Sequence, residues 1–152
     1  MTHKNSSQQY LKQQLLLAEK ARKWLEHSLK QCDTINLADL SMADFDKLES
    51  LSRLYGRFVD ILINKLFRAV DQYELMEAGT LIDTLNRAEK RGIVSSKTGR
   101  ELKELRNLIV HEHDVDVVSQ SAADIMHYAE IAIKVYEKLL EYLAKSHKME
   151  LE

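Results

Sequence analysis

Apolar residues recur every three or four positions over most of this chain, which is the spacing of one face of an α-helix. The first such stretch runs from about Gln8 to Gln31, and the polar residues 1–7 before it are expected to be disordered. Its inward positions are all aliphatic: Leu11, Leu15, Ala18, Ala21, Leu25 and Leu29. Residues 33–40 have no sustained period and predict a loop.

A second, longer helix is predicted to start after Ser41 and to run to about Tyr73. Ser41 stands three positions before Asp44, a spacing that resembles a capping box. Gly56, inside this stretch, indicates either a close helix crossing or simple tolerance of a glycine. The apolar surface is wider than one neighbouring helix needs, which suits a second copy of the chain. It comprises Leu48, Leu51, Leu54, Tyr55, Phe58, Val59, Ile61, Leu62, Ile63, Phe67, Ala69 and Val70.

Two shorter helices are predicted after Gly79. The first has one apolar face made of Leu81, Ile82, Leu85 and Ala88. Gly92 stands where a left-handed C-terminal cap favours glycine, and Ile93 can fold back onto the last turn. Ser95 or Ser96 can cap the next helix, which ends near His111 with three inward residues, Leu102, Leu105 and Ile109. Residues 114–118 are expected to connect it to a last helix that opens at Ser119 or Ser121.

These elements predict an all-α fold, an up-and-down helical bundle of about five helices in which the two short helices together replace one long helix. No repeat occurs at a fixed period. A single domain is expected over residues 8–147, followed by a tail at 148–152.

Composition narrows the class of protein further. The chain has 152 residues, no proline and only four glycines, which suits one helical domain. Its net charge of −2 gives no overall attraction for nucleic acid, so any RNA contact must come from a local basic patch. Cys32 is the only cysteine, which excludes an intrachain disulfide and a cysteine-based metal site. The N-terminus lacks the apolar core of a signal peptide, and no apolar run reaches membrane-spanning length. We therefore expect a cytoplasmic protein that does not associate with a membrane.

Groups that can do chemistry crowd together at the predicted end of the fourth helix, at positions 106–113: Arg106, Asn107, His111, Glu112 and His113. A histidine can transfer protons near neutral pH, and an arginine can bind phosphate through its planar fork. The pair suits cleavage of a phosphodiester without a metal or cofactor, with histidine as general acid–base and arginine stabilising charge on the phosphoryl oxygens. RNA is the expected substrate, because its 2′-hydroxyl can act as the nucleophile.

The spacing of this pair sets a geometric condition. Arg106 and His111 are five residues apart, roughly 140° around an ideal helix at about 100° per residue. For both to reach one phosphate, the helix must unwind near His111, the arginine must reach around the helix, or the two residues must come from two chains. A two-fold dimer would satisfy the third condition.

The run Arg106-Asn107-Leu108-Ile109-Val110-His111 resembles the R-x4–6-H signature of HEPN domains, in which a polar residue often follows the arginine. The resemblance spans roughly residues 45–142 and is greatest to HepT-type proteins, which are encoded beside a minimal nucleotidyltransferase. It implies a homodimeric helical bundle that acts as the ribonuclease toxin of a toxin–antitoxin pair, with the nucleotidyltransferase as cognate antitoxin. Arg106 and His111 would be the catalytic pair at the dimer cleft, with Asn107 as a supporting residue.

One position departs from the HepT pattern. HepT-type motifs commonly have a tyrosine two positions after the histidine, and the partner enzyme attaches adenylate to it. Here that position is His113, a second supporting residue. The departure leaves open a non-catalytic HEPN protein that binds substrate for a nucleotidyltransferase, and a purely structural helical dimer is the third possibility.

Each candidate residue also has a structural interpretation. Arg106 can form a salt bridge with Glu101 or Asp114, and His111 can be a helix C-terminal histidine favoured by the helix dipole. Two histidines two positions apart fit a metal site on a helix poorly. A nearby basic cluster is either a solvated face or a phosphate track for RNA, with Lys97, Arg100 and Lys103 as the expected contacts. Its members are Arg87, Lys90, Arg91, Lys97, Arg100 and Lys103.

Overall fold

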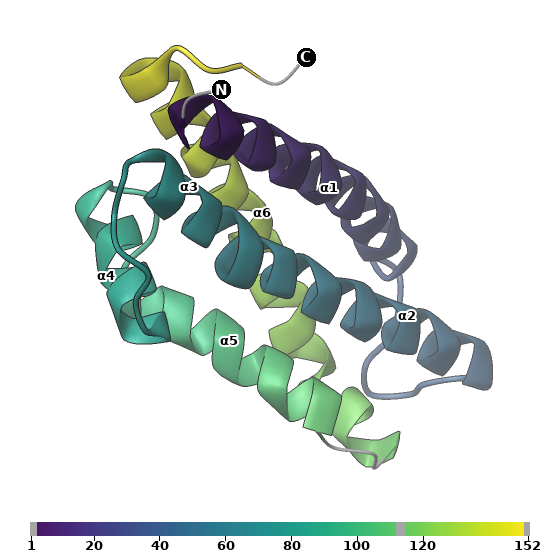
Figure 1. Ribbon diagram of the computed structural model, residues 1–152. Helices are drawn as coiled ribbons and strands as arrows, with labels where there is room; N and C mark the ends of the chain where they lie inside the picture. Colours follow the sequence, from purple (N-terminus) through teal and green to yellow (C-terminus); the bar gives the residue numbers. More distant parts are fainter. Residues whose placement is uncertain (1–2, 112–114, 151–152) are drawn as a thin grey trace.

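A computed structural model describes residues 3–111 and 115–150, and the regular elements in these two ranges are helices. They are α1 (His3–Gln31), α2 (Met42–Val59), η1 (Asp60–Phe67), α3 (Arg68–Tyr73), α4 (Leu81–Lys90), α5 (Ser96–His111) and α6 (Val115–His147). α2, η1 and α3 follow one another without a break and form one long rod (Figure 1). With this rod counted once, the chain folds as the predicted all-α, up-and-down bundle of five helices.

Both terminal helices are longer than the sequence predicted. α1 begins at His3, so residues 3–7 are helical where disorder was expected. Ser7 explains the extension, because it lies one turn before Leu11 on the inward face and is buried. α6 begins at Val115, ahead of the predicted starts at Ser119 or Ser121. Asp116 in its first turn is favoured by the helix dipole.

The C-terminal tail also contributes to the core. Lys148 has a φ of 51°, which turns the chain back after α6. The N–H of Met149 then donates to the carbonyl oxygen of Leu143 at 3.1 Å, and the Met149 side chain is buried. Residue 149 is therefore part of the packed domain.

The rod is the central element of the bundle. The predicted capping box is present at its start: Ser41 Oγ accepts from the Asp44 N–H at 3.1 Å, and the Asp44 carboxylate accepts from the Ser41 N–H at 3.1 Å. The sequence did not predict η1, a π-helical segment whose backbone hydrogen bonds join residues five apart. π-helical segments are rare in proteins, and many of those that occur lie at functional sites.

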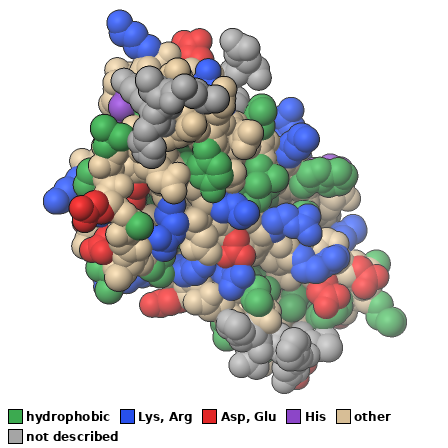
Figure 2. All heavy atoms as spheres, in the orientation of Figure 1, with side chains coloured by type: hydrophobic (Ala, Val, Ile, Leu, Met, Phe, Trp, Pro, Cys, Tyr) green, Lys and Arg blue, Asp and Glu red, His purple; other side chains and the backbone are tan. Residues whose placement is uncertain are grey.

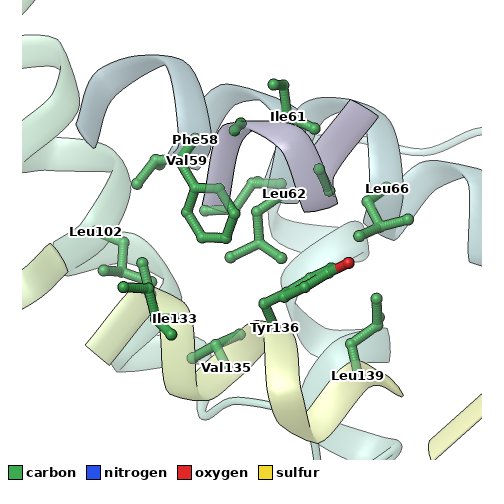
Figure 3. Packing of buried hydrophobic residues seen from close by; sticks show 14 of the residues in the cluster. Phe58, Val59, Ile61, Leu62, Leu66, Leu102, Ile133, Val135, Tyr136 and Leu139 are labelled. Atoms are coloured by element: carbon green, nitrogen blue, oxygen red, sulfur yellow. The ribbon is translucent and has the colours of Figure 1, made fainter. Parts of the chain in front are cut away.

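The wide apolar surface of the rod is buried within one chain. α1, α4, α5 and α6 all pack around it, and Val59, Leu62 and Ile63 are fully buried. The interpretation of this surface as a face for a second copy is therefore wrong, because four neighbours in the same chain cover it. Figure 3 shows Phe58 and Leu62 pointing from the rod toward α6, where the Tyr136 ring meets Phe58 edge-on at 5.8 Å.

The two short helices have the predicted caps. Gly92 has a φ of 77°, and the N–H of Ile93 donates to the carbonyl oxygen of Ala88 at 3.0 Å, as in a Schellman motif. Ser95, rather than Ser96, caps α5 by accepting from the Thr98 N–H at 3.1 Å. One residue of the predicted α4 face was wrong: Ile82 is 62% exposed. Thr84 takes the inward position instead and is fully buried.

Two glycines should respond in opposite directions to alanine. Gly92→Ala is expected to lower the free energy of unfolding by about 1 kcal/mol, because an L-residue is strained at positive φ. Gly56→Ala is expected to be neutral or to stabilise by up to about 1 kcal/mol, because alanine favours helix and its Cβ fits. Urea unfolding of both variants measures the effects. Equal effects of the two substitutions would contradict the assignment of Gly92 as the cap.

None of the helices in the described ranges combines the length and the apolar character that a bilayer crossing requires.

Candidate functional site

The candidate residues of α5 lie where this helix crosses the rod. Tyr55 Oη donates to the carbonyl oxygen of Leu102 at 2.8 Å, which fixes α5 against α2. One residue further, buried Gly56 faces α5: a Cβ there would lie 3.8 Å from Arg106 Cγ and 3.9 Å from Val110 Cγ2. Gly56 thus lies at a helix crossing, although these ordinary contact distances leave room for alanine. We call this region the rod–α5 crossing.

Arg106 is held at the crossing by two polar partners. Its Nη2 lies 2.6 Å from Asp60 Oδ2, and its Nη1 donates to Asn107 Oδ1 at 3.2 Å. Its Nε is buried and has no hydrogen-bond partner among the described residues. The side chain is 21% exposed, so part of the guanidinium remains accessible to solvent. Asn107 therefore supplies one of the two acceptors that hold the Arg106 guanidinium in place.

Asp60 is the residue of this site that the sequence did not reveal. It is the first residue of η1 and also lies 3.4 Å from Lys103 Nζ, so one carboxylate joins two basic residues of α5. The predicted salt-bridge partner Glu101 instead accepts from Tyr128 Oη at 2.6 Å, and Asp114 lies outside the described residues. Asp60 could have been identified from the sequence, because it follows Gly56 by four residues and therefore lies on the same side of the helix.

The two histidines are only partly covered by the structure. α5 remains an α-helix through His111, so the proposed unwinding before this residue does not occur. Positions 106 and 111 therefore stay five residues apart on one continuous helix, roughly 140° around its axis. The His111 side chain and all of Glu112, His113 and Asp114 lie outside the described residues. Arg106 and His111 can therefore reach one phosphate in two remaining ways. Either the Arg106 side chain extends around the helix, or the two residues come from two different chains.

Basic residues flank Arg106 on both elements of the crossing. We call them the basic band: Arg53, Arg57 and Lys65 on the rod, and Lys97, Arg100, Lys103 and Arg106 on α5. Figure 2 shows Lys and Arg side chains gathered over the rod and α5, with an acidic side chain among them. Lys97 and Arg100 are exposed, whereas Lys103 is partly buried beside Asp60. The band contrasts with the net charge of −2 of the whole chain.

Two further members of the predicted basic cluster have a structural role. Arg91 contacts Asp71 at 2.8 Å and Glu74 at 2.9 Å, and Arg87 contacts Asp71 at 3.1 Å. These pairs lie where α3, α4 and α6 end, and cations near helix C-termini are favoured by the dipole. Arg87 and Arg91 therefore link α4 to the end of α3 through ion pairs within the chain.

Glu74 is the centre of this ion-pair cluster. Burial disfavours its charged form, but hydrogen bonds from Tyr142 and His147 and the charge of Arg91 outweigh burial and hold the pKa of Glu74 below its ordinary value. His147 Nε2 lies 2.7 Å from its carboxylate. The cluster thus fastens the C-terminal part of α6 to the end of α3.

The depressed pKa of Glu74 predicts a pH dependence of stability. A carboxylate with a lowered folded-state pKa stabilises the fold above its unfolded pKa of ~4.3, and this contribution disappears as pH falls through the folded-state pKa. Wild type should therefore exceed Glu74→Gln in stability near pH 7, and the difference should shrink toward about pH 3. Urea unfolding at several pH values measures it, with exposed Glu77→Gln as control. A difference that is constant over this range would contradict the prediction.

In the described ranges, no three side chains from His, Cys, Asp and Glu gather as a metal site would require. Comparison with known proteins adds no relative: no family model, no curated protein and no solved structure matches this chain.

Proposed function

We propose that this protein is a metal-independent endoribonuclease of the HEPN type, the toxin of a toxin–antitoxin pair, that acts through Arg106 and His111. The observation that carries the proposal is the position of Arg106. Its guanidinium is fixed between Asp60 and Asn107, remains partly exposed, and lies within the basic band. The R-x4-H motif of α5 supplies the histidine.

The chemistry divides between the two residues. A guanidinium has five N–H donors in a rigid plane, and Asp60 and Asn107 accept from one nitrogen each. Because Nε is buried, the second N–H of each Nη nitrogen is the donor left to bind the phosphoryl oxygens and to stabilise the charge that develops on them. His111 takes the proton from the 2′-hydroxyl or gives one to the leaving oxygen. Because the two positions diverge on a continuous helix, the arginine of one chain acts with the histidine of the other in a homodimer.

The proposal includes the surroundings of the site. Lys97, Arg100 and Lys103 bind RNA phosphates beside the catalytic pair, and His113 supports the pair from the next chain segment. The cognate antitoxin is a nucleotidyltransferase-type protein, and both act in the cytoplasm.

Cleavage of RNA in excess EDTA tests the proposal directly. The purified protein should cut a single-stranded RNA, and should leave the same sequence intact when every 2′-hydroxyl is replaced by hydrogen. Products should end in a 2′,3′-cyclic phosphate, because the 2′-oxygen is the nucleophile. Intact RNA after incubation, or equal cutting of the deoxy strand, would refute the proposal.

The ion pair itself favours a second candidate. Asp60 at 2.6 Å offsets the charge of Arg106, as in a salt bridge that only stabilises the fold. The alternative function is a non-catalytic HEPN partner that binds substrate for a minimal nucleotidyltransferase. Co-purification with a small nucleotidyltransferase, together with RNA that stays uncut, would favour this alternative.

A further inference from the structure

The contacts at the rod–α5 crossing define the register between the two helices. Asp60 meets Arg106 and Lys103, and Gly56 faces Arg106 and Val110. Residue numbers therefore fall on the rod as they rise on α5, so the two helices run antiparallel (Figure 1). By this register, residues before Gly56 on the rod lie beside the last turn of α5.

Arg53 and Arg57 occupy this part of the rod. They precede Asp60 by seven and three residues, which places them on the side of the helix that Asp60 presents to α5. Both are exposed. Arg57 has no ion pair within the described part of the chain, and Arg53 has only a hydrogen bond to Ser50 Oγ at 3.5 Å. Two charged guanidinium groups thus extend from the level of Arg106 toward the end of α5.

The electrostatic balance at the crossing favours an anion. Asp60 is the carboxylate seen to pair with the seven basic residues of the basic band, through Arg106 and Lys103. Exposed Glu49 and Glu104 lie on the same two helices, and Glu101 is occupied by Tyr128. The rod members Arg53, Arg57 and Lys65 lie away from the ends of the rod, whereas Lys97 lies in the first turn of α5, where the positive end of the helix dipole adds to the positive potential. An apolar side chain is exposed next to Arg106: Val110 is 45% exposed and, like Arg106, faces Gly56.

We infer that Arg53 and Arg57 bind the phosphates of a single-stranded RNA on the side of Arg106 that leads to His111. The strand runs along the crossing, with Lys97 and Arg100 on one side of Arg106 and the two α2 arginines on the other. Unpaired bases can then contact the exposed side chain of Val110, which lies beside Arg106 at Gly56, as a duplex with its bases stacked inside cannot. This inference rests on the proposed RNA substrate, and it assigns the strand two contacts from a helix outside the R-x4-H motif.

Binding to an uncleavable strand tests the inference separately from catalysis. The probe is a fluorescent single-stranded 2′-O-methyl RNA of 12 nucleotides, whose blocked 2′-oxygen prevents cleavage, and its anisotropy is followed against salt concentration. Each lost phosphate contact lowers the slope of log K against log salt by about 0.7 for single strands. Arg53→Gln/Arg57→Gln should therefore lower the slope by about 1.4 and the affinity at low salt by at least tenfold.

A matched control removes two charges elsewhere. Lys134 and Lys138 are exposed on α6 with the same spacing of four residues, so Lys134→Gln/Lys138→Gln changes the net charge equally. The control should bind as wild type does. No binding of the probe by wild type, or equal losses in both double variants, would overturn the inference. Normal binding slopes without cleavage of natural RNA would instead refute the proposed catalytic function and leave the inference standing.

Discussion

Arg106→Ala and His111→Ala should each reduce the rate of RNA cleavage by about 10²- to 10⁴-fold, the usual contribution of a positioned acid–base or charge-stabilising group. Fold stability should change little by comparison. The Arg106–Asp60 pair is partly exposed on both sides, and such pairs contribute up to about 1 kcal/mol. Single-turnover cleavage in EDTA and urea unfolding measure the two effects. Cleavage at the wild-type rate by either variant would contradict the assigned roles.

Mixing the two inactive variants tests whether the site is shared between chains. In a heterodimer, the arginine of the His111→Ala chain and the intact histidine of the Arg106→Ala chain complete one site and leave the other empty. With half of the dimers mixed and one of two sites active, about a quarter of wild-type activity should return. No recovery after subunit exchange would mean that each site is built within one chain.

Among the substitutions proposed here, Arg91→Ala should lower the free energy of unfolding the most. Its side chain is 8% exposed and pairs with Asp71, which is 6% exposed. Breaking a buried ion pair by removing one partner costs roughly 3–5 kcal/mol. Without Arg91, the buried Asp71 carboxylate keeps only the more exposed Arg87 at 3.1 Å, so we expect a loss toward the lower end of this range. The loss should appear as a lower midpoint of urea unfolding with an unchanged slope.

The adjacent residue provides the control for Arg91. Lys90 lies in the same last turn of α4, but it is exposed and forms no salt bridge with an acidic residue of the described ranges. Lys90→Ala should change the free energy of unfolding by less than about 0.5 kcal/mol. A loss below about 1 kcal/mol for Arg91→Ala would show that the cluster is solvated rather than structural.

Features determined by neighbours in sequence were predictable. The Ser41–Asp44 capping box and the Gly92 turn follow from backbone groups that must find partners within a few residues, and both are present as predicted. The helix order followed from the spacing of apolar residues. The early start of α1 was missed because the inward position is a serine, which no hydrophobic pattern marks.

Features that depend on packing between distant segments were not predictable. Asp60 looks like a solvent-facing residue of a long helix, and its partner Arg106 lies 46 residues further along the chain. The wide apolar surface of the rod was equally ambiguous, because sequence alone cannot distinguish four neighbours within a chain from a second copy. The motif gave the catalytic candidates, whereas the partner that orients Arg106 required the fold.

The π-helical segment η1 should determine where the rod can lose a residue without disturbing its packing. A turn closed by bonds between residues five apart contains about one residue more than an α-helical turn, so it absorbs an extra residue without rotating the helix after it. Deleting one residue within 60–67 should tighten η1 into an ordinary turn and leave Asp71 and Tyr73 facing inward. α2 has no extra residue in its turns, so a deletion there would rotate the rest of the rod by about 100° about its axis. The segment that begins at Asp60 is therefore the part of the buried rod where the deletion of a single residue is best tolerated.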